Sequence, residues 1–258
     1  MILQELINYL ESQVPLNIQE SYDNCGLLTG EPSQSITKTL ISLDCTSEII
    51  EEAIQNNCNL IICHHPIVFK GLLKFSSQNY IGKTIIKAIQ NNIAIYVMHT
   101  NLDKVENGVS YAMAKKLQLE NITILAPEAE NIGLGAVGQF KTAITHNQFL
   151  NLVKNTFHNT PIRYTNFIKD SIQKVALCGG SGSFLLQNAI TQKADVYISS
   201  DFKYHQFFDA NNEITIVDIG HYEAENVSKE IITAILLKKF PTFAFCFSKI
   251  NTNPVNYY

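Results

Sequence analysis

The chain has 258 residues, of which 46% are hydrophobic and 16% are charged, so general disorder is excluded and a substantial core is expected. This length fits one large domain or two. The net charge is −4 and Arg163 is the only arginine, which argues against nucleic-acid binding as the primary role.

The first fifteen residues place apolar side chains at helical spacing and have no basic start, so they predict an amphipathic helix rather than a signal peptide. No apolar run approaches the ~18 residues that a bilayer span requires. The six cysteines include no CxxC pair and are spread along the chain, which favours reduced thiols. We therefore expect a cytoplasmic protein with no membrane partner.

Strand and helix patterns alternate after this first helix, as expected for largely parallel sheets covered by helices. In the first half, the predicted strands are 39–44, 59–66, 93–103 and 122–127, and the predicted helices begin at Thr46 or Ser47, at residue 80 and at residue 108. In the second half, helices are predicted at 146–157, 183–193 and 221–240, and strands at 175–180, 194–201, 213–220 and 242–248.

A polar stretch at 127–135 is a plausible boundary between two halves of similar organisation. We therefore predict an α/β fold with two lobes, residues 1–127 and 128–258. In an alternative arrangement, the terminal helix and strand of the second lobe pack back on the first lobe. Ligands of open α/β sheets collect at the carboxyl ends of strands, where several of the histidines of this chain also lie.

His64 and His65 close one predicted strand immediately before Pro66. Adjacent residues of a strand face opposite ways, so the pair suits two neighbouring metal ions better than chelation of a single ion. The alternative is a pair of histidines that bond to backbone carbonyls.

His221 follows another predicted strand, and Glu225 lies four residues later on the same helix face. Such a pair can chelate a metal or remain solvated. Asp103 closes a third strand, where a helix cap or an Asx turn is the alternative to a metal ligand.

Together, three imidazoles and two carboxylates exceed the needs of one open zinc site and suit two divalent ions, with Glu225 as a possible bridge. Two such ions and two carboxylates leave a net +2, which attracts an anionic substrate. A bridging water in this field would provide hydroxide for hydrolysis. The mixed nitrogen and oxygen donors permit Zn, Fe, Mn, Co or Ni.

Five motifs resemble, in this order, those of the NGG-interacting-factor-like dinuclear metal-centre proteins, often labelled type 2 GTP cyclohydrolase I homologues. They are SYDNCGLLTG, ICHHPIVFKG, MHTNLDKVENGV, SSDFKYHQ and DIGHYEAE, and they span nearly the whole chain.

The resemblance implies a two-lobed α/β subunit, a dinuclear site between the lobes, and a toroidal homohexamer. It implies that two divalent ions per subunit are held by His64, His65, Asp103, His221 and Glu225. Two departures concern outer motifs: Tyr22 stands where the family usually has Trp, and Ser200 where it usually has Gly. Some larger family members insert a domain between the lobes, for which 258 residues leave no room.

Further polar residues are candidates for supporting a metal ligand or for binding substrate, with turns, solvated strand ends or structural histidines as the alternatives. They are His99, Asp201, Lys203, His205, Asp23 and Asn24. Asp201, Lys203 and His205 alternate as on an extended segment. The glycines of GGSGS at 179–183 fail the dinucleotide-loop spacing, which favours a packing turn over a phosphate nest.

We therefore expect a dinuclear-metal hydrolase-like protein that acts through metal-bound hydroxide on a small anionic, phosphorylated or nucleotide-like compound. GTP cyclohydrolase activity is a narrower version that only the resemblance suggests. The alternative is a non-catalytic metal-binding scaffold, or an assembly for metal storage or delivery. Catalytic acid and base residues are not assigned by the sequence.

Overall fold

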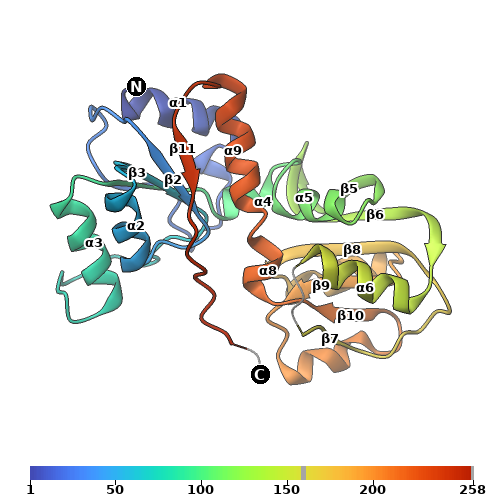
Figure 1. Cartoon of the computed structure of the whole chain (residues 1–258). Coiled ribbons are helices and arrows are strands. Elements are labelled where there is room, and N and C mark those ends of the chain that lie inside the picture. The colour runs from blue at the N-terminus through green and yellow to red at the C-terminus, as the bar shows by residue number, and fades with distance from the viewer. Residues whose placement is uncertain (158–160, 257–258) are drawn as a thin grey trace. The chain divides into compact units, whose positions relative to one another are not determined.

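The structure is a computed structural model that describes residues 1–157 and 161–256 (Figure 1). The chain forms two compact units. Unit 1 comprises Met1–Leu102 and Ser228–Pro254, and unit 2 consists mainly of Asp103–Val227. Each unit contains one sheet flanked by helices, which confirms the predicted class of two α/β lobes.

The sheet of unit 1 has five strands in the order β1-β4-β3-β2-β11. The strands are β1 (Gly26–Thr29), β2 (Thr39–Ser42), β3 (Leu60–Cys63), β4 (Ala94–Val97) and β11 (Phe245–Phe247). All neighbours pair in parallel except β1, which runs antiparallel to β4. Ser42 pairs with Cys63, and Cys63 pairs with Val97, so β2, β3 and β4 end at one edge.

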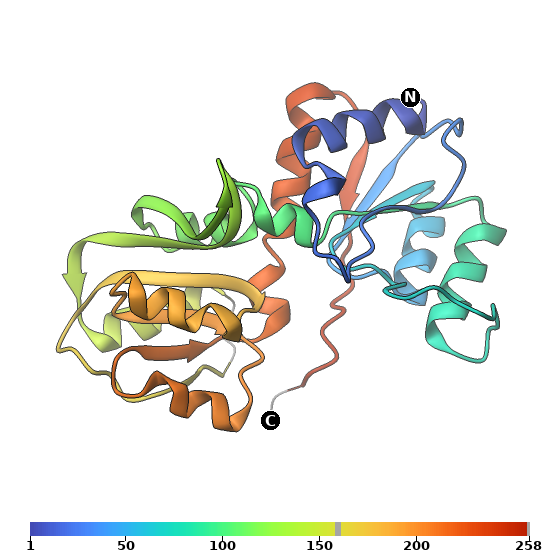
Figure 2. The same cartoon turned by 180° about the vertical axis from the view of Figure 1, so that it is seen from behind.

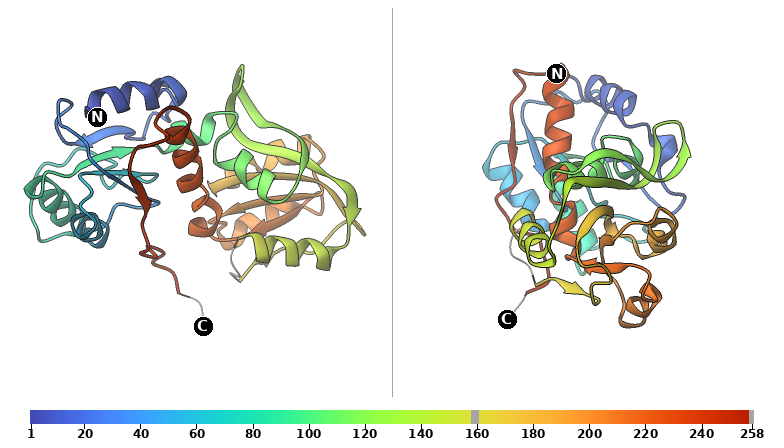
Figure 3. Two further views of the ribbon diagram at one scale, coloured as in Figure 1. Left: turned by 45° about the horizontal axis from the view of Figure 1, so that its top comes forward. Right: turned by 90° about the vertical axis from the view of Figure 1, so that its right-hand side faces the viewer.

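Helices cover both faces of this sheet. They are α1 (Leu3–Gln13), α2 (Ser47–Gln55), α3 (Tyr80–Gln90) and α9 (Ser228–Lys239), with a short 3₁₀ helix at Leu16–Ile18. The helix α2 begins as predicted, because Thr46 caps it by accepting from the amide of Ile49. It lies beside α3 (Figure 3). Ile50 and Ile85 join strand residues such as Ile61 in one core. α9 packs on β2, and α1 packs on α9 (Figure 2).

The sheet of unit 2 has six strands in the order β5-β6-β8-β9-β10-β7. The strands are β5 (Glu120–Ala129), β6 (Ile132–Ile144), β7 (Arg163–Tyr164), β8 (Ile172–Ser181), β9 (Val196–Ser200) and β10 (Thr215–Asp218). Only β8, β9 and β10 pair in parallel, so this sheet is mixed rather than largely parallel. Its helices are α5 (Val109–Lys116), α6 (His146–Thr156), α7 (Leu186–Thr191) and α8 (His221–Glu225), with 3₁₀ helices at Ser183–Leu185 and Tyr204–Ala210.

The stretch predicted as a boundary forms the tip of the β5–β6 hairpin instead. Pro127 pairs with Gly133 across this hairpin, and Asn131 adopts a positive φ of 59° at its turn. The units divide at Leu102 and Asp103, inside α4 (Thr100–Lys104), rather than near residue 128. The strand predicted at 122–127 is part of β5. Because β5 pairs with β6, it belongs to unit 2 and not to the first lobe.

The predicted helix over 221–240 is interrupted, because α8 ends at Glu225 and α9 begins at Ser228. α8 contacts β8 and β9 of unit 2, whereas α9 and β11 belong to unit 1. The alternative in which the terminal helix and strand join the first lobe is therefore the observed one. Among the described residues, no helix is both long enough and apolar enough to cross a membrane.

Candidate metal centre

Three imidazoles gather where the strands of unit 1 end. His64 and His65 follow β3, and both of their amides donate to the carbonyl of Leu43, just after β2. The rings of His64, His65 and His99, which we call the histidine cluster, have centroids 5.1 to 5.3 Å apart. Each offers a ring nitrogen within 4.8 Å of the others. This spacing is short enough for a metal ion to use more than one of them.

His64 is fully buried, and its Nδ1 lies 2.7 Å from the carbonyl oxygen of Met98. A carbonyl only accepts, so Nδ1 must donate, and in a neutral ring Nε2 then carries a lone pair. The sequence left open whether this histidine bonds to backbone or binds a metal. The geometry allows both, because each function uses a different nitrogen.

His65 is oriented by Asp44, a residue that the sequence analysis missed. Its Nδ1 lies 2.7 Å from Oδ1 of Asp44, and the second oxygen of this carboxylate accepts from the hydroxyl of Thr252. A carboxylate behind an imidazole fixes the ring and raises its basicity, as in many metal sites. Asp44 follows β2, so the strand-end signal that identified the histidines also applied to it.

His99 is oriented by Asp23, whose Oδ1 lies 2.8 Å from its Nδ1. The same carboxylate accepts from the amide and hydroxyl of Thr100. Burial raises the pKa of Asp23, but the hydrogen bonds from His99 and Thr100 outweigh it and hold the pKa well below its usual range. Asn24 turns away, because its side chain donates to the carbonyl of Val68 at 2.6 Å.

In unit 2, His221 lies between two carboxylates. Its Nδ1 is 2.7 Å from Asp201 and its Nε2 is 2.9 Å from Glu225. Burial by itself lowers the pKa of His221. The hydrogen bonds to Asp201 and Glu225 outweigh this effect and raise the pKa to about 11. The hydrogen bond from His221 in turn lowers the pKa of Asp201. We call His221, Glu225 and Asp103 the carboxylate set.

Glu225 is only 3% exposed and lies against the two glycines, Gly179 and Gly180, near the end of β8. A Cβ on Gly180 would lie 2.1 Å from Oε1 of Glu225, so only glycine leaves room for this carboxylate. Gly180 also has a positive φ of 62°, and its carbonyl accepts from the hydroxyls of Ser199 and Ser200. The end of β8 therefore packs against Glu225.

Asp103 lies in α4 and is half-buried. Burial, together with the charges of Asp103 and Glu225, raises the pKa of Cys178 to about 12. Both carboxylates therefore lie near this thiol, in the same region of unit 2.

The segment SSDFKYH is not extended as predicted. Asp201 has a positive φ of 59°, and a 3₁₀ helix begins at Tyr204, directly after Lys203. The ring of His205 packs with the exposed rings of Tyr204 and Phe208. The turn directs Asp201 to His221, whereas Lys203 and His205 belong to the start of the helix. Strict alternation fails because it assumes β backbone angles at Asp201.

The donor atoms fit a borderline divalent ion. In His64 and His65, an oxygen atom holds Nδ1, so Nε2 is the nitrogen that faces a ligand, whereas Nε2 of His221 faces Glu225. Such second contacts are usual for histidines that bind metal. Carboxylates of Asp103 and Glu225 add oxygen donors, which together with imidazole suit Zn, Fe, Mn, Co or Ni.

The fold and these side chains define an α/β protein with histidine and carboxylate groups, able to hold metal, at the carboxyl ends of strands. The chain belongs to the Duf34/NIF3 (NGG1p interacting factor 3) family, whose model matches residues 1–254. This finding confirms the family resemblance recognised from the five motifs.

Curated relatives carry the name GTP cyclohydrolase 1 type 2 homolog. The Clostridium acetobutylicum protein is 35% identical over 227 residues, covering 86% of this chain and 85% of its own. The Campylobacter jejuni protein is 31% identical and covers both chains completely. The Staphylococcus epidermidis protein, 28% identical, aligns over 370 positions, more than the 258 residues present here. That relative therefore has positions that this chain lacks.

Solved structures share the fold. Staphylococcus aureus protein SA1388 is 28% identical with a TM-score of 0.91, covering 100% of this chain and 99% of its own. Reduced HcgD from Methanocaldococcus jannaschii is 27% identical with a TM-score of 0.82, covering 97% of this chain and 98% of its own. A Bacillus cereus protein related to NIF3 has a TM-score of 0.92 at 24% identity, which shows the fold alone.

Proposed function

We propose that this protein is a dinuclear-metal hydrolase-like enzyme that acts on a small phosphorylated or nucleotide-like compound. In this proposal, two divalent ions are held by His64, His65, Asp103, His221 and Glu225. One observation carries it: an acceptor oxygen holds Nδ1 of His64 and of His65, which directs Nε2 of each ring to a ligand.

The proposal joins the histidine cluster of unit 1 to the carboxylate set of unit 2 in one centre. When bound, two divalent ions would act as Lewis acids and lower the pKa of bound water toward neutrality. His64 and His65 would supply neutral nitrogen donors. The carboxylates of Asp103 and Glu225 would offset part of the metal charge, leaving a site that attracts anions.

His99 and Asp201 have supporting roles in this proposal. Asp201 orients His221 through their bond of 2.7 Å, and Asp23 orients His99 through one of 2.8 Å. His99 would stand beside the metal ligands with its Nε2 available to bind substrate or water. In keeping with the family motifs, we further propose a cytoplasmic homohexamer, which light scattering of the purified protein would test.

The test is reconstitution followed by turnover. Protein stripped with a chelator is loaded separately with Zn, Mn, Fe, Co and Ni, and bound metal is measured by elemental analysis. We expect two equivalents per chain, and hydrolysis within a panel of nucleotides and phosphoesters. His65→Ala and Glu225→Ala should each lose metal and activity.

His146→Ala is the matched control, because His146 stacks on Phe167 with ring centroids 4.1 Å apart and bonds the carbonyl of Lys169. It should retain both metal ions and turnover. Two bound equivalents without turnover across the panel would contradict the enzyme and favour a metal-binding scaffold. Fewer than two equivalents would contradict the dinuclear centre.

A further inference from the structure

The end of β8 carries a bulge, inside the segment GGSGS that was predicted to form a packing turn. From Leu177 to Ser181, β8 advances four residues, whereas β9 advances only two, from Ile198 to Ser200. We call residues 178–180 the β8 bulge. Bulges redirect the side chains that follow them and recur beside functional sites.

Buried hydroxyl groups from β9 hold this bulge. Ser199 and Ser200, both 0% exposed, donate to the carbonyl of Gly180 at 2.9 and 2.6 Å. The hydroxyl of Tyr197, also fully buried, donates to the carbonyl of Gly182 at 2.7 Å. A buried hydroxyl without a partner is unfavourable, so these bonds favour one conformation of the bulge.

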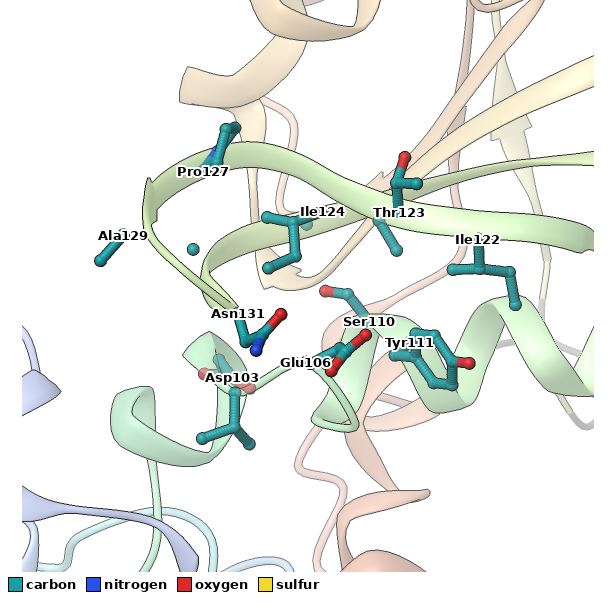
Figure 4. Close-up of a pocket in the computed structure, with 14 residues that line it drawn as sticks. Asp103, Glu106, Ser110, Tyr111, Ile122, Thr123, Ile124, Pro127, Ala129 and Asn131 are labelled. Carbon is teal, nitrogen blue, oxygen red and sulfur yellow. The ribbon is translucent and has the colours of Figure 1, made fainter.

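The helix α5 holds the bulge as well. The amide of Gly179 donates at 3.1 Å to the hydroxyl of Ser110, which lines the cavity drawn in Figure 4. A Cβ on Gly179 would also lie 3.6 Å from Cγ of Glu225. The β8 bulge is therefore fixed by two neighbouring elements and lies against a proposed metal ligand.

Ser181 is the first residue after the bulge. It pairs with Ser200, which places it beside Asp201, the next residue of that strand. The hydroxyl of Ser181 donates to Oδ2 of Asp201, and the same oxygen lies 2.7 Å from Nδ1 of His221. The Asp201 side chain is 48% exposed, so water competes for it and a second donor restricts its orientation.

We infer that Ser181 is a positioning residue of the proposed metal centre. Its hydroxyl holds Asp201, and Asp201 holds Nδ1 of His221, so that Nε2 stays directed toward Glu225, 2.9 Å away. The β8 bulge thus serves two proposed ligands, because Gly180 leaves room for Glu225 and Ser181 orients His221. The effect on metal rests on the proposed function, whereas the chain of contacts does not.

Competition between zinc-loaded protein and a chromophoric chelator tests the effect on metal. We expect Ser181→Ala to lower zinc affinity about 3- to 10-fold, the value of one ordinary hydrogen bond. Asp201→Ala should lower it about 10- to 100-fold. The double variant should match Asp201→Ala, because Ser181 acts only through Asp201. Ser181→Thr keeps the hydroxyl and should restore near-normal affinity.

A second measurement uses metal-free protein. Proton NMR with labelled histidine follows the exchange with water of the proton on Nδ1 of His221, which is assigned by its absence in His221→Gln. Ser181→Ala should accelerate this exchange about 3- to 10-fold, because Asp201 holds the ring less firmly. Ser181 is exposed, so the Tm should change little.

Ser183→Ala is the matched control, because the hydroxyl of Ser183 accepts from Nε2 of Gln206 at 2.9 Å. It should keep the wild-type zinc affinity and exchange rate. Additive losses in the double variant, equal losses in Ser181→Thr and Ser181→Ala, or an unchanged exchange rate in Ser181→Ala would each overturn the inference. Failure to bind metal would contradict the proposed function, while the exchange rate in metal-free protein would still decide whether Ser181 holds this pair.

Discussion

The hydroxyl of Thr252 donates a hydrogen bond to Asp44, a residue 208 positions earlier in the chain. The other oxygen of Asp44 holds His65 at 2.7 Å, so the segment after β11 supports a proposed metal ligand through one intermediate. The same segment is fixed by Glu52, which accepts from the hydroxyl of Ser248 and from the amide of Lys249. It therefore has a defined position beside the histidine cluster.

Removing the hydroxyl of Thr252 should weaken metal binding without unfolding the protein. We expect Thr252→Val to lower metal affinity about 10-fold, and Asp44→Asn to lower it about 10- to 100-fold, the usual range for partners of metal-bound histidines. Competition with a chromophoric chelator measures this affinity. Thr252→Ser keeps the hydroxyl and should restore near-normal affinity, and equal losses in the valine and serine variants would contradict the role of the hydroxyl.

Gly180→Ala should displace Glu225. Its new Cβ would lie 2.1 Å from Oε1 of Glu225, at a backbone φ of 62° that alanine disfavours. We expect a loss of about 1–3 kcal/mol in the free energy of unfolding and at least one metal equivalent fewer per chain. Gly71→Ala is the control, because nothing lies within 4 Å of its Cβ position. Full metal content in Gly180→Ala would refute the proposed role of Glu225.

Asp23→Asn should destabilise unit 1 in a pH-dependent way. The Asp23 side chain is 0% exposed, and its pKa is held below the ordinary 3.8 by His99 and Thr100 despite burial. A carboxylate with a lowered native pKa contributes stability above its unfolded pKa, and this stability is lost as the pH falls below that value.

We therefore expect Asp23→Asn to cost about 2–3 kcal/mol near pH 7, because a charged acceptor is lost from a buried network. Denaturant unfolding from pH 7 down to pH 3 should show this difference narrowing below about pH 4. Glu51→Gln is a control at an exposed carboxylate and should differ little from wild type at any pH. A difference for Asp23→Asn that is constant over this range would contradict the expected titration.

Cys58 and Cys246 should form a disulfide when the protein is treated with oxidised glutathione. Their sulfur atoms lie 3.7 Å apart, and all six cysteines are free. Burial and the neighbouring Cys246 raise the pKa of Cys58 to about 12, so the less buried Cys246 should attack first and release one glutathione. Cys58 then displaces the second.

Mass spectrometry should find the 58–246 peptide pair lighter by two hydrogen atoms, together with two released glutathione molecules. The crosslink should raise the Tm, because it closes a long loop of the unfolded chain. Cys246→Ser should abolish the product. A mixed disulfide with glutathione that persists at Cys246 would contradict the pairing.

The local pattern of side chains determined most of the elements. Short, largely apolar runs predicted β2 to β4, and the cap at Thr46 predicted the start of α2, because these signals arise from neighbours along the chain. The strand-end histidines and the His221–Glu225 spacing also follow from local geometry. This is why the sequence alone identified candidate metal ligands.

Tertiary structure decided the features that depend on partners far along the chain. The β5–β6 hairpin replaced an expected boundary, because pairing with β6 satisfies the backbone of a polar strand whose sequence resembles a loop. The ends of α8 and α9 differ from the predicted single helix because each packs in a different unit.

The supporting contacts of the histidines depended most on tertiary structure. Asp44 is 21 residues from His65, and Asp23 is 76 residues from His99. No local periodicity encodes which carboxylate faces which imidazole nitrogen, because sheet register and loop packing bring these groups together. The sequence thus determined which residue types stand at the strand ends, and only the folded chain determined which atom of each one is turned toward a ligand.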